Sequence, residues 1–217
     1  MLKRCSMKRM NLANAINLRF AAIVFGLASG FGSVAQSVNY YNYNGVQELQ
    51  FVYSNTVKGN TGENISEGTL QIFRNADSNR DGKISVAELR NFQRWLKRSF
   101  RYKENATALH PDDFVAQGGG DCEDFAIMTT CMLNYHGVVA YVAMFGRVTV
   151  NKHAVCIAQV TTSKTPGYLY YTLNGWGIPS GTYIPIDYEK VGGLSAIDRR
   201  WKIARVYKPF TIYGVYM

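Results

Sequence analysis

Apolar residues recur at helical spacing in the first half of the chain. One series predicts an amphipathic helix, since its members lie three or four residues apart and basic residues occupy most other positions. The series is Leu89, Phe92, Trp95, Leu96 and Phe100. A shorter helix is predicted over residues 66–75. Another helix is predicted over residues 121–135, and His136 and Gly137, which follow it, form a stop signal.

The second half of the chain has the pattern of strands. It is rich in Val, Ile, Tyr and Thr and is interrupted by Gly, Pro and Ser. The predicted strands span residues 138–145, 148–150, 154–160, 168–174, 203–207 and 211–216. Because the helices come first and the strands follow, the sequence predicts an α+β domain with a largely antiparallel sheet.

The N-terminal segment explains much of the positive charge. The chain has 217 residues, 47% of them apolar and 18% charged, with a formal net charge of +9. Basic residues before residue 36 have no acidic counterparts, and a short apolar run and small residues ending at Ala35 follow them. This pattern predicts a signal peptide over residues 1–35. We therefore expect an exported protein, periplasmic or secreted, with no nucleic-acid partner and no stable membrane span after cleavage.

Residues 77–88 fit the twelve-residue calcium loop of an EF-hand. Oxygen ligands for Ca²⁺ fall at the diagnostic positions, with Lys83 contributing its backbone carbonyl: Asp77, Asn79, Asp81, Lys83 and Glu88. Gly82 supplies the sharp turn. The alternative is a solvated Asp/Asn turn between two helices. Since the sequence contains one such loop, and extracellular modules bind calcium at about 0.1–1 mM, we expect calcium to stabilise the fold.

A candidate reactive centre follows the Gly-rich residues 118–120. Cys122 lies in the first turn of the predicted helix 121–135, where unpaired N–H groups and the helix dipole favour a thiolate. His153 precedes a predicted strand and Asn174 ends the next one. Antiparallel neighbours could place these two side by side, giving a Cys-His-Asn set. The alternative is that Cys122 is a small core residue and His153 a hydrogen-bonded edge residue.

The stretch from Leu96 to Gly175 resembles the bacterial transglutaminase-like cysteine peptidases of the papain-like/transglutaminase superfamily. The matching motifs are Arg101-Tyr102, Pro111-Asp-Asp-Phe, Gly-Gly-Asp-Cys-Glu-Asp-Phe-Ala, His136-Gly137-Val and Thr172-Leu-Asn-Gly. The resemblance implies a catalytic helix packed on an antiparallel sheet, a protein substrate, Cys122 as nucleophile and His153 as base. Asn174 would fill the orienting position.

The sequence departs from the family at the third catalytic position, which is usually Asp. Asp187 is the reserve candidate. Some relatives bind calcium beside the nucleophile, which implicates Asp121, Glu123 and Asp124 in a second site. Acidic residues in the first turn of a helix are also favourable without any metal.

Together these features predict four segments. They are a signal peptide (1–35), an N-terminal surface segment (36–65), an EF-hand helix-loop-helix (66–103) and a transglutaminase-like peptidase core (104–217).

The predicted function is that of an exported calcium-binding cysteine peptidase that cleaves a protein substrate, with surface proteins and exported proteins as candidates. The alternatives are an acyl transferase using the same site and a non-catalytic calcium-stabilised binding module. The sequence leaves open the substrate and a Cys131–Cys156 disulfide.

Overall fold

A computed structural model describes residues 37–39, 49–54, 65–147, 150–161, 165, 167–188, 190–194 and 202–207. The predicted signal peptide and the predicted strand 211–216 lie outside these residues. Within the described part, no helix has the length and apolar character needed to cross a membrane.

Most of the described strands follow the helices, as the sequence predicts, but three short strands lie before or between the helices. The helices are α1 (Glu67–Arg74), α2 (Val86–Ser99), α3 (Pro111–Gln117) and α4 (Cys122–Tyr135). The strands are β1 (Ser37–Asn39), β2 (Arg101–Tyr102), β3 (Gly119–Gly120), β4 (Ala140–Arg147), β5 (Val150–Val160), β6 (Tyr170–Leu173), β7 (Gly181–Asp187), β8 (Lys190–Val191) and β9 (Lys202–Tyr207).

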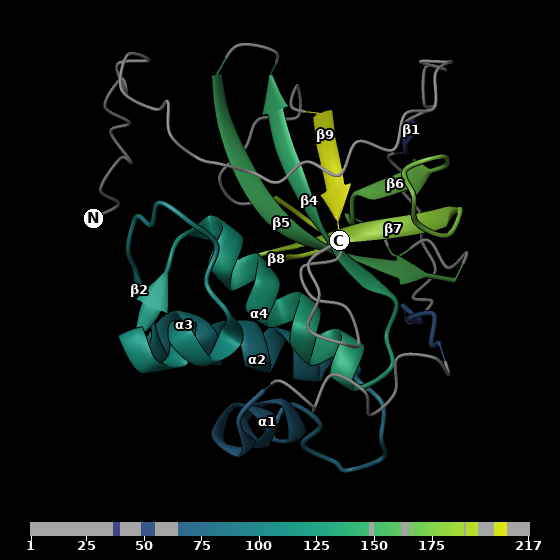
Figure 1. Ribbon diagram of the computed structural model, residues 1–217. Coiled ribbons are helices and arrows are strands. Elements are labelled where there is room, and N and C mark those ends of the chain that lie inside the picture. The colour runs from purple at the N-terminus through teal and green to yellow at the C-terminus, as the bar shows by residue number, and fades with distance from the viewer. Residues whose placement is uncertain are drawn as a thin grey trace. The chain divides into compact units, whose positions relative to one another are not determined.

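The main sheet is antiparallel and carries the helices on one side. Its strand order is β1-β6-β7-β5-β4-β9, with β8 paired to β7. Helix α4 packs against β5 and β4, and α1 and α2 lie beyond it (Figure 1). The predicted α+β fold is confirmed: a helix packs on an antiparallel sheet and an EF-hand element precedes it.

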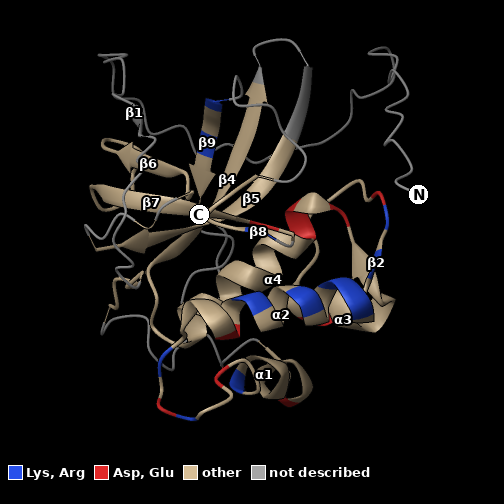
Figure 2. Cartoon of the chain, turned by 180° about the vertical axis from the view of Figure 1, so that it is seen from behind, with Lys and Arg blue, Asp and Glu red and all other residues tan. Residues whose placement is uncertain are grey.

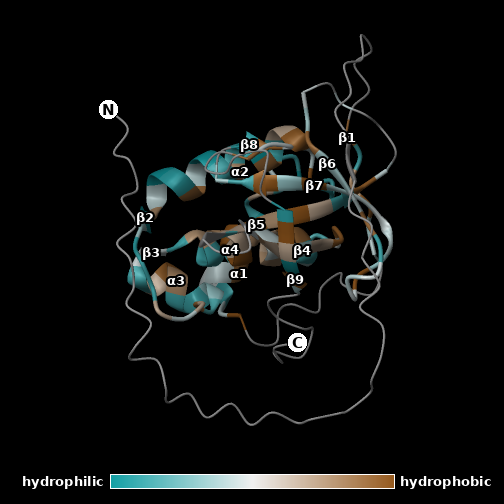
Figure 3. Cartoon of the chain, turned by 90° about the horizontal axis from the view of Figure 1, so that it is seen from above, coloured by the Kyte–Doolittle hydropathy of each residue, from teal (hydrophilic) through white to brown (hydrophobic). Residues whose placement is uncertain are grey.

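Strand β5 separates two apolar clusters because successive side chains point to opposite faces. Ala154 and Cys156 belong to the large cluster shared with the helices, whereas Val155 and Ile157 join Tyr183 in a smaller cluster. Helix α4 is buried along most of its length, and apolar residues are concentrated on it and on the strands above it (Figure 3). The helix that begins at Cys122 is therefore held rigidly.

Helix α2 has the amphipathic character that its sequence predicts. Leu89 and Leu96 are buried, whereas its Arg and Lys residues are exposed along the outer side (Figure 2). On the inner side, Gln93 donates a buried hydrogen bond of 2.8 Å to Thr129 of α4. The basic face is thus the solvated side of a packed helix.

Two elements that bear on the candidate site, helix α3 and strand β7, were not predicted from the sequence. Helix α3 is short and begins with Pro111 at its first position, where the missing N–H costs no hydrogen bond. Strand β7 contains Pro185, and proline normally argues against a central strand. Here Pro185 lies opposite Ile157 of β5, and β7 lies between β5 and β6. This insertion decides which residues meet at the candidate catalytic site.

Candidate functional site

The EF-hand loop joins α1 to α2 and is wound around its acidic side chains. Asp77 accepts hydrogen bonds from the backbone N–H groups of Gly82 (2.8 Å) and Asp81 (3.2 Å). Asn79 Oδ1 accepts another from Asp81 N (2.9 Å). Gly82 has a φ of 77°, in the left-handed region that favours glycine, so the sharp turn lies where the motif requires it.

Glu88, the last residue of the loop, connects its two ends. Oε1 accepts hydrogen bonds from Ser78 N and Oγ (2.9 Å each) and from Asn79 N (3.2 Å), while Oε2 accepts from Ser85. Burial alone raises the pKa of this carboxyl, but the hydrogen bonds outweigh it and lower the pKa to about 2. Glu88 is therefore a carboxylate at neutral pH.

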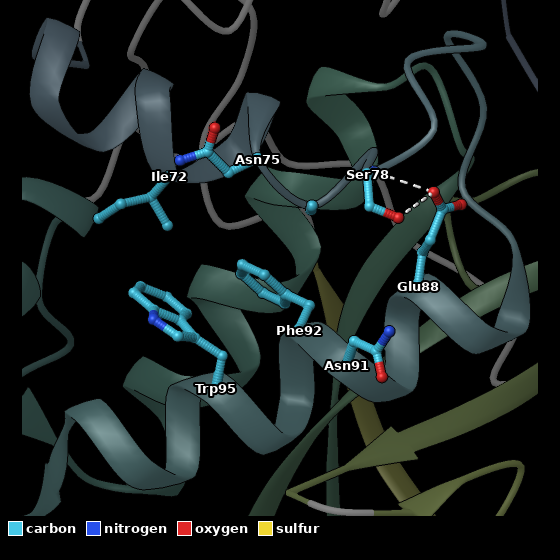
Figure 4. A pocket seen from close by; sticks show the side chains of 8 residues that line it. Ile72, Asn75, Ser78, Glu88, Asn91, Phe92 and Trp95 are labelled. Atoms are coloured by element: carbon cyan, nitrogen blue, oxygen red, sulfur yellow. Dashed lines mark hydrogen bonds between the residues drawn. The ribbon is translucent and has the colours of Figure 1, made fainter.

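A pocket of about 270 Å³ lies between α1 and α2 behind this carboxylate. Figure 4 shows Ile72, Phe92 and Trp95 on its apolar side and the Ser78–Glu88 hydrogen bonds at its polar end.

The donor chemistry of the loop fits a hard cation. The candidate ligands are carboxylate, amide and backbone carbonyl oxygens, the donors that Ca²⁺ prefers. In the described part of the chain, no three or more His, Cys, Asp or Glu side chains form a compact metal cluster. In the loop itself, Glu88 is turned toward Ser78, Asn79 and Ser85. A calcium ion at the loop would compete for these carboxylate oxygens.

Cys122 is the first residue of α4 and is partly exposed. Asp121 caps the helix by accepting hydrogen bonds from Glu123 N (2.8 Å) and Asp124 N (3.4 Å), and Asp124 accepts one in return from Asp121 N (2.8 Å). This capping box fixes the turn that carries the thiol. The backbone N–H of Cys122 has no partner within the helix ladder, because it is one of the first four.

Glycine is required at positions 119 and 120, shortly before Cys122, because the chain packs closely there. A Cβ on Gly119 would lie 1.9 Å from the carbonyl oxygen of Arg101, and one on Gly120 would lie 2.2 Å from Asp124 Oδ2. Asp124 is fully buried and also accepts hydrogen bonds from Asn105 Nδ2 (2.6 Å) and Leu109 N (2.7 Å). The Gly-rich segment thus sets the position of the helix end.

His153 is paired with Asp187 and faces Cys122. His153 Nε2 lies 3.0 Å from Asp187 Oδ1, and the two residues are 8% and 2% exposed. Burial alone lowers the pKa of His153, but hydrogen bonds and charge interactions with Asp187 and Cys122 raise it to about 9. Since Nε2 is held by Asp187, Nδ1 is the ring nitrogen left for the Cys122 sulfur. The structure therefore brings Cys122, His153 and Asp187 together.

The structure does not place Asn174 beside His153, contrary to the sequence expectation. Asn174 follows β6 and is exposed, and its Oδ1 accepts a hydrogen bond of 2.9 Å from Ser180 Oγ. Strand β7 separates β6 from β5, so the assumption that consecutive strands are neighbours fails. Asp187, the reserve candidate, ends β7 and meets the imidazole instead.

Tyr188 is a further residue of the site that the sequence did not reveal. Its ring is nearly parallel to that of His153 (7°, centroids 6.5 Å apart) and packs on Phe125 (centroids 5.0 Å apart). Its φ of 32° is positive, an uncommon conformation for a bulky residue. Its hydroxyl is buried and has no hydrogen-bond partner among the described residues. Strained residues of this kind concentrate at functional sites.

The acidic residues proposed for a second calcium site have other partners in this structure. Glu123 accepts a hydrogen bond from the Tyr207 hydroxyl of β9, and Asp121 and Asp124 form the capping box of α4. Burial, followed by the charge of Asp124, raises the pKa of Asp121. These contacts explain the acidic run without requiring a metal ion.

The described cysteines are not joined by disulfides. Cys131 and Cys156 are both buried in the large apolar cluster, and burial raises the pKa of Cys156 to about 12. Among the described cysteines, Cys122 is thus the one that is partly exposed.

Comparisons with known proteins identify one sequence family and several similar structures. The EF hand family model matches residues 70–93. No curated protein matches the sequence. A structure of Legionella pneumophila LapG treated with EGTA is 18% identical, with a TM-score of 0.44, and covers 74% of this chain and 84% of that one. A second LapG structure is 17% identical, with a TM-score of 0.36 and coverages of 66% and 88%.

A third similar structure is a proposed cysteine protease from Cytophaga hutchinsonii. It is 12% identical, with a TM-score of 0.35, and covers 74% of this chain and 65% of that one. The residues of the site are assigned from the contacts of this chain.

Proposed function

We propose that this protein is an exported, calcium-binding cysteine peptidase with Cys122 as nucleophile, His153 as base and Asp187 as the orienting residue. The observation that carries the proposal is the contact of one buried imidazole with both Asp187 and the side chain of the partly exposed Cys122. A nucleophile, a base in contact with it and a third group that orients the base form the general arrangement of covalent catalysis.

The chemistry follows from the position of each group. The Cys122 thiolate attacks the carbonyl carbon of a peptide bond, and the Cys122 backbone N–H at the start of α4 stabilises the oxyanion. The His153 imidazolium then donates its proton to the leaving amine, and Asp187 holds the ring during the transfer. Neutral His153 next removes a proton from water, which hydrolyses the acyl-enzyme. If an amine reached the acyl-enzyme instead, the same site would transfer the acyl group.

Calcium has a structural role in this proposal. The ligands would be Asp77, Asn79, Asp81, the Lys83 carbonyl and Glu88, and the bound ion would join the two ends of the loop. The EF-hand family match supports this assignment. A second ion beside Cys122, at Asp121 and Glu123, is the competing location.

The proposal also includes a class of substrate and a cellular compartment. We infer a protein substrate, since the attack described above cleaves a peptide bond, and export to the periplasm or the medium, since the N-terminal sequence has the pattern of a signal peptide. The basic outer face of α2 is the solvated side of a packed helix, so it provides no reason to assign a nucleic-acid partner.

A thiol-reactive activity probe tests the proposal. In the chain that begins after Ala35, we expect Cys122 to react much faster than an ordinary thiol near neutral pH. Cys122→Ala should abolish both labelling and peptide cleavage while leaving the circular dichroism spectrum unchanged. Cys131→Ala is the matched control, since that thiol is buried. Cleavage by Cys122→Ala would refute the enzyme assignment, and products formed with and without an added amine would separate hydrolysis from acyl transfer.

A further inference from the structure

Ile84, the central apolar residue of the EF-hand loop, has a buried side chain and a backbone satisfied by a distant residue. Its backbone N–H donates to the hydroxyl oxygen of Tyr53 at 3.0 Å, and its carbonyl oxygen lies 3.4 Å from the same hydroxyl. A hydroxyl group can both accept and donate, so one side chain serves both polar groups of Ile84 as a neighbouring strand would. Tyr53 lies 31 residues before Ile84 in the sequence.

The backbone around Tyr53 is attached to the sheet and to the end of α4. Tyr53 forms an antiparallel bridge with Val138, and Ser54 N donates to the carbonyl of Gly137 (2.8 Å). Val139 N donates in turn to Val52 O (2.9 Å). These bonds fix the segment at the junction where α4 ends and β4 begins, so the Tyr53 side chain reaches the loop from a rigid support.

The hydroxyl contacts the loop between the first and last candidate calcium ligands. Ile84 follows Asp81 and Lys83 and precedes Glu88, so its backbone position sets the distance between the two halves of the ligand set. Burial, followed by the charges of Asp81, Glu88 and Asp77, raises the pKa of Tyr53, although the hydrogen bond with Ile84 opposes this shift. The hydroxyl therefore keeps its proton and its ability to donate at neutral pH.

We propose that Tyr53 is a positioning residue for the calcium loop: its hydroxyl holds the Ile84 backbone in the ion-binding conformation and ties this single EF-hand to the α4–β4 junction. The proposal rests on the proposed calcium-binding function of the loop. Without the hydroxyl, the loop must order Ile84 when the ion binds, and calcium affinity falls accordingly.

Calcium titration of the mature chain and of Tyr53→Phe tests this proposal. Phenylalanine keeps the ring and removes the hydroxyl, and a lost hydrogen bond of this kind corresponds to a roughly two- to tenfold weaker Kd. Isothermal titration calorimetry measures the Kd directly, without any substrate. The matched control is Tyr168→Phe, which removes a hydroxyl that contacts Arg90 of α2 (2.5 Å) and does not touch the loop. We expect the control to bind calcium as the unmodified chain does.

Hydrogen exchange of the Ile84 amide in calcium-free protein provides an independent measurement. Tyr53→Phe should exchange this amide faster than either the unmodified chain or Tyr168→Phe, because its acceptor is gone. Equal Kd values for Tyr53→Phe and the control would overturn the proposal. If the unmodified chain does not bind calcium, the proposed calcium function fails. In that case, unchanged exchange of the Ile84 amide in Tyr53→Phe would also overturn the proposed hold of Tyr53 on the loop, whereas faster exchange would support that hold.

Discussion

The imidazole of His153 lies between a buried carboxylate and a thiol, and both favour its charged form. The structure thereby gives the candidate nucleophile a cationic neighbour, a condition that makes thiolates reactive near neutral pH. Asp187 is buried behind the ring, so its charge acts on His153 with little screening by solvent. The Tyr188 ring lies nearly parallel to the same imidazole.

This environment predicts how the stability of the protein depends on pH. The pKa of His153 is raised from 6.5 to about 9 by folding, so its contribution to stability is fully present below about pH 6.5 and is lost as pH rises through 9. We expect the free energy of unfolding lost in His153→Ala to be larger at pH 6 than at pH 9.5. Urea denaturation at both pH values measures it. An equal loss at both would show that the imidazolium is not stabilised.

The third catalytic residue can be identified by two substitutions. Asp187→Asn keeps the size of the side chain but removes the charge that favours the imidazolium, so turnover should fall on the order of a hundredfold or more. Asn174→Ala is the comparison, since Asn174 is exposed and bonded to Ser180, and it should change turnover less than about twofold. Rates of peptide cleavage measure both. A large loss in Asn174→Ala alone would return the orienting role to that residue.

At the scale of elements, the sequence indicated Cys122 and His153 as candidate site residues but did not identify the carboxylate that meets the imidazole. Cys122 was predicted because the Gly-rich approach and the helix start are adjacent in sequence. The choice between Asn174 and Asp187 depends on strand order, which the sequence does not encode locally. Because Pro185 argues against a strand, the sequence does not indicate β7, and the two predicted strands before it are expected to be neighbours. The strain at Tyr188 has no sequence signal, since tyrosine is uncommon at positive φ.

The glycines before α4 allow a prediction about the β2–β3 pairing. Gly119→Ala should destabilise the protein by at least twice as much as Gly118→Ala. A methyl group at Gly119 meets the backbone of Arg101, whereas one at Gly118 meets nothing within 4 Å. Gly118 has a φ of 70°, so its substitution should cost about 1–2 kcal/mol through backbone strain alone. Denaturant unfolding of the two variants measures the difference, and equal losses would contradict the close packing.

At the scale of the whole molecule, the EF-hand braces the candidate catalytic helix from the side opposite the sheet. His136 Nε2, just after α4, lies 2.8 Å from the carbonyl oxygen of Phe73 of α1, and Arg74 donates to the Tyr135 hydroxyl (3.1 Å). Helix α2 reaches the middle of α4 through Gln93. Cys122 lies at the other end of α4, so the loop can affect the thiol through the packing of the helix and not through contact.

Calcium should therefore stabilise the whole domain. A ligand that binds only the folded state stabilises it by about 2.7 kcal/mol at a hundredfold excess over Kd, which for a chain of this size raises Tm by roughly 5–10 °C. Glu88→Gln weakens the proposed bidentate ligand and should remove most of this rise. Glu67→Gln, which alters an exposed ion pair with Arg74 at the start of α1, should retain it.

Differential scanning calorimetry with and without calcium measures the rise in Tm, and the same variants locate any dependence of activity on calcium. If activity is lost on chelation in the unmodified chain but no longer responds to calcium in Glu88→Gln, the loop is responsible. If Glu88→Gln still requires calcium for activity, the ion acts beside Cys122 at Asp121 and Glu123. No change in the Tm of the unmodified chain would contradict the EF-hand assignment itself, because the ion would then not bind the folded protein.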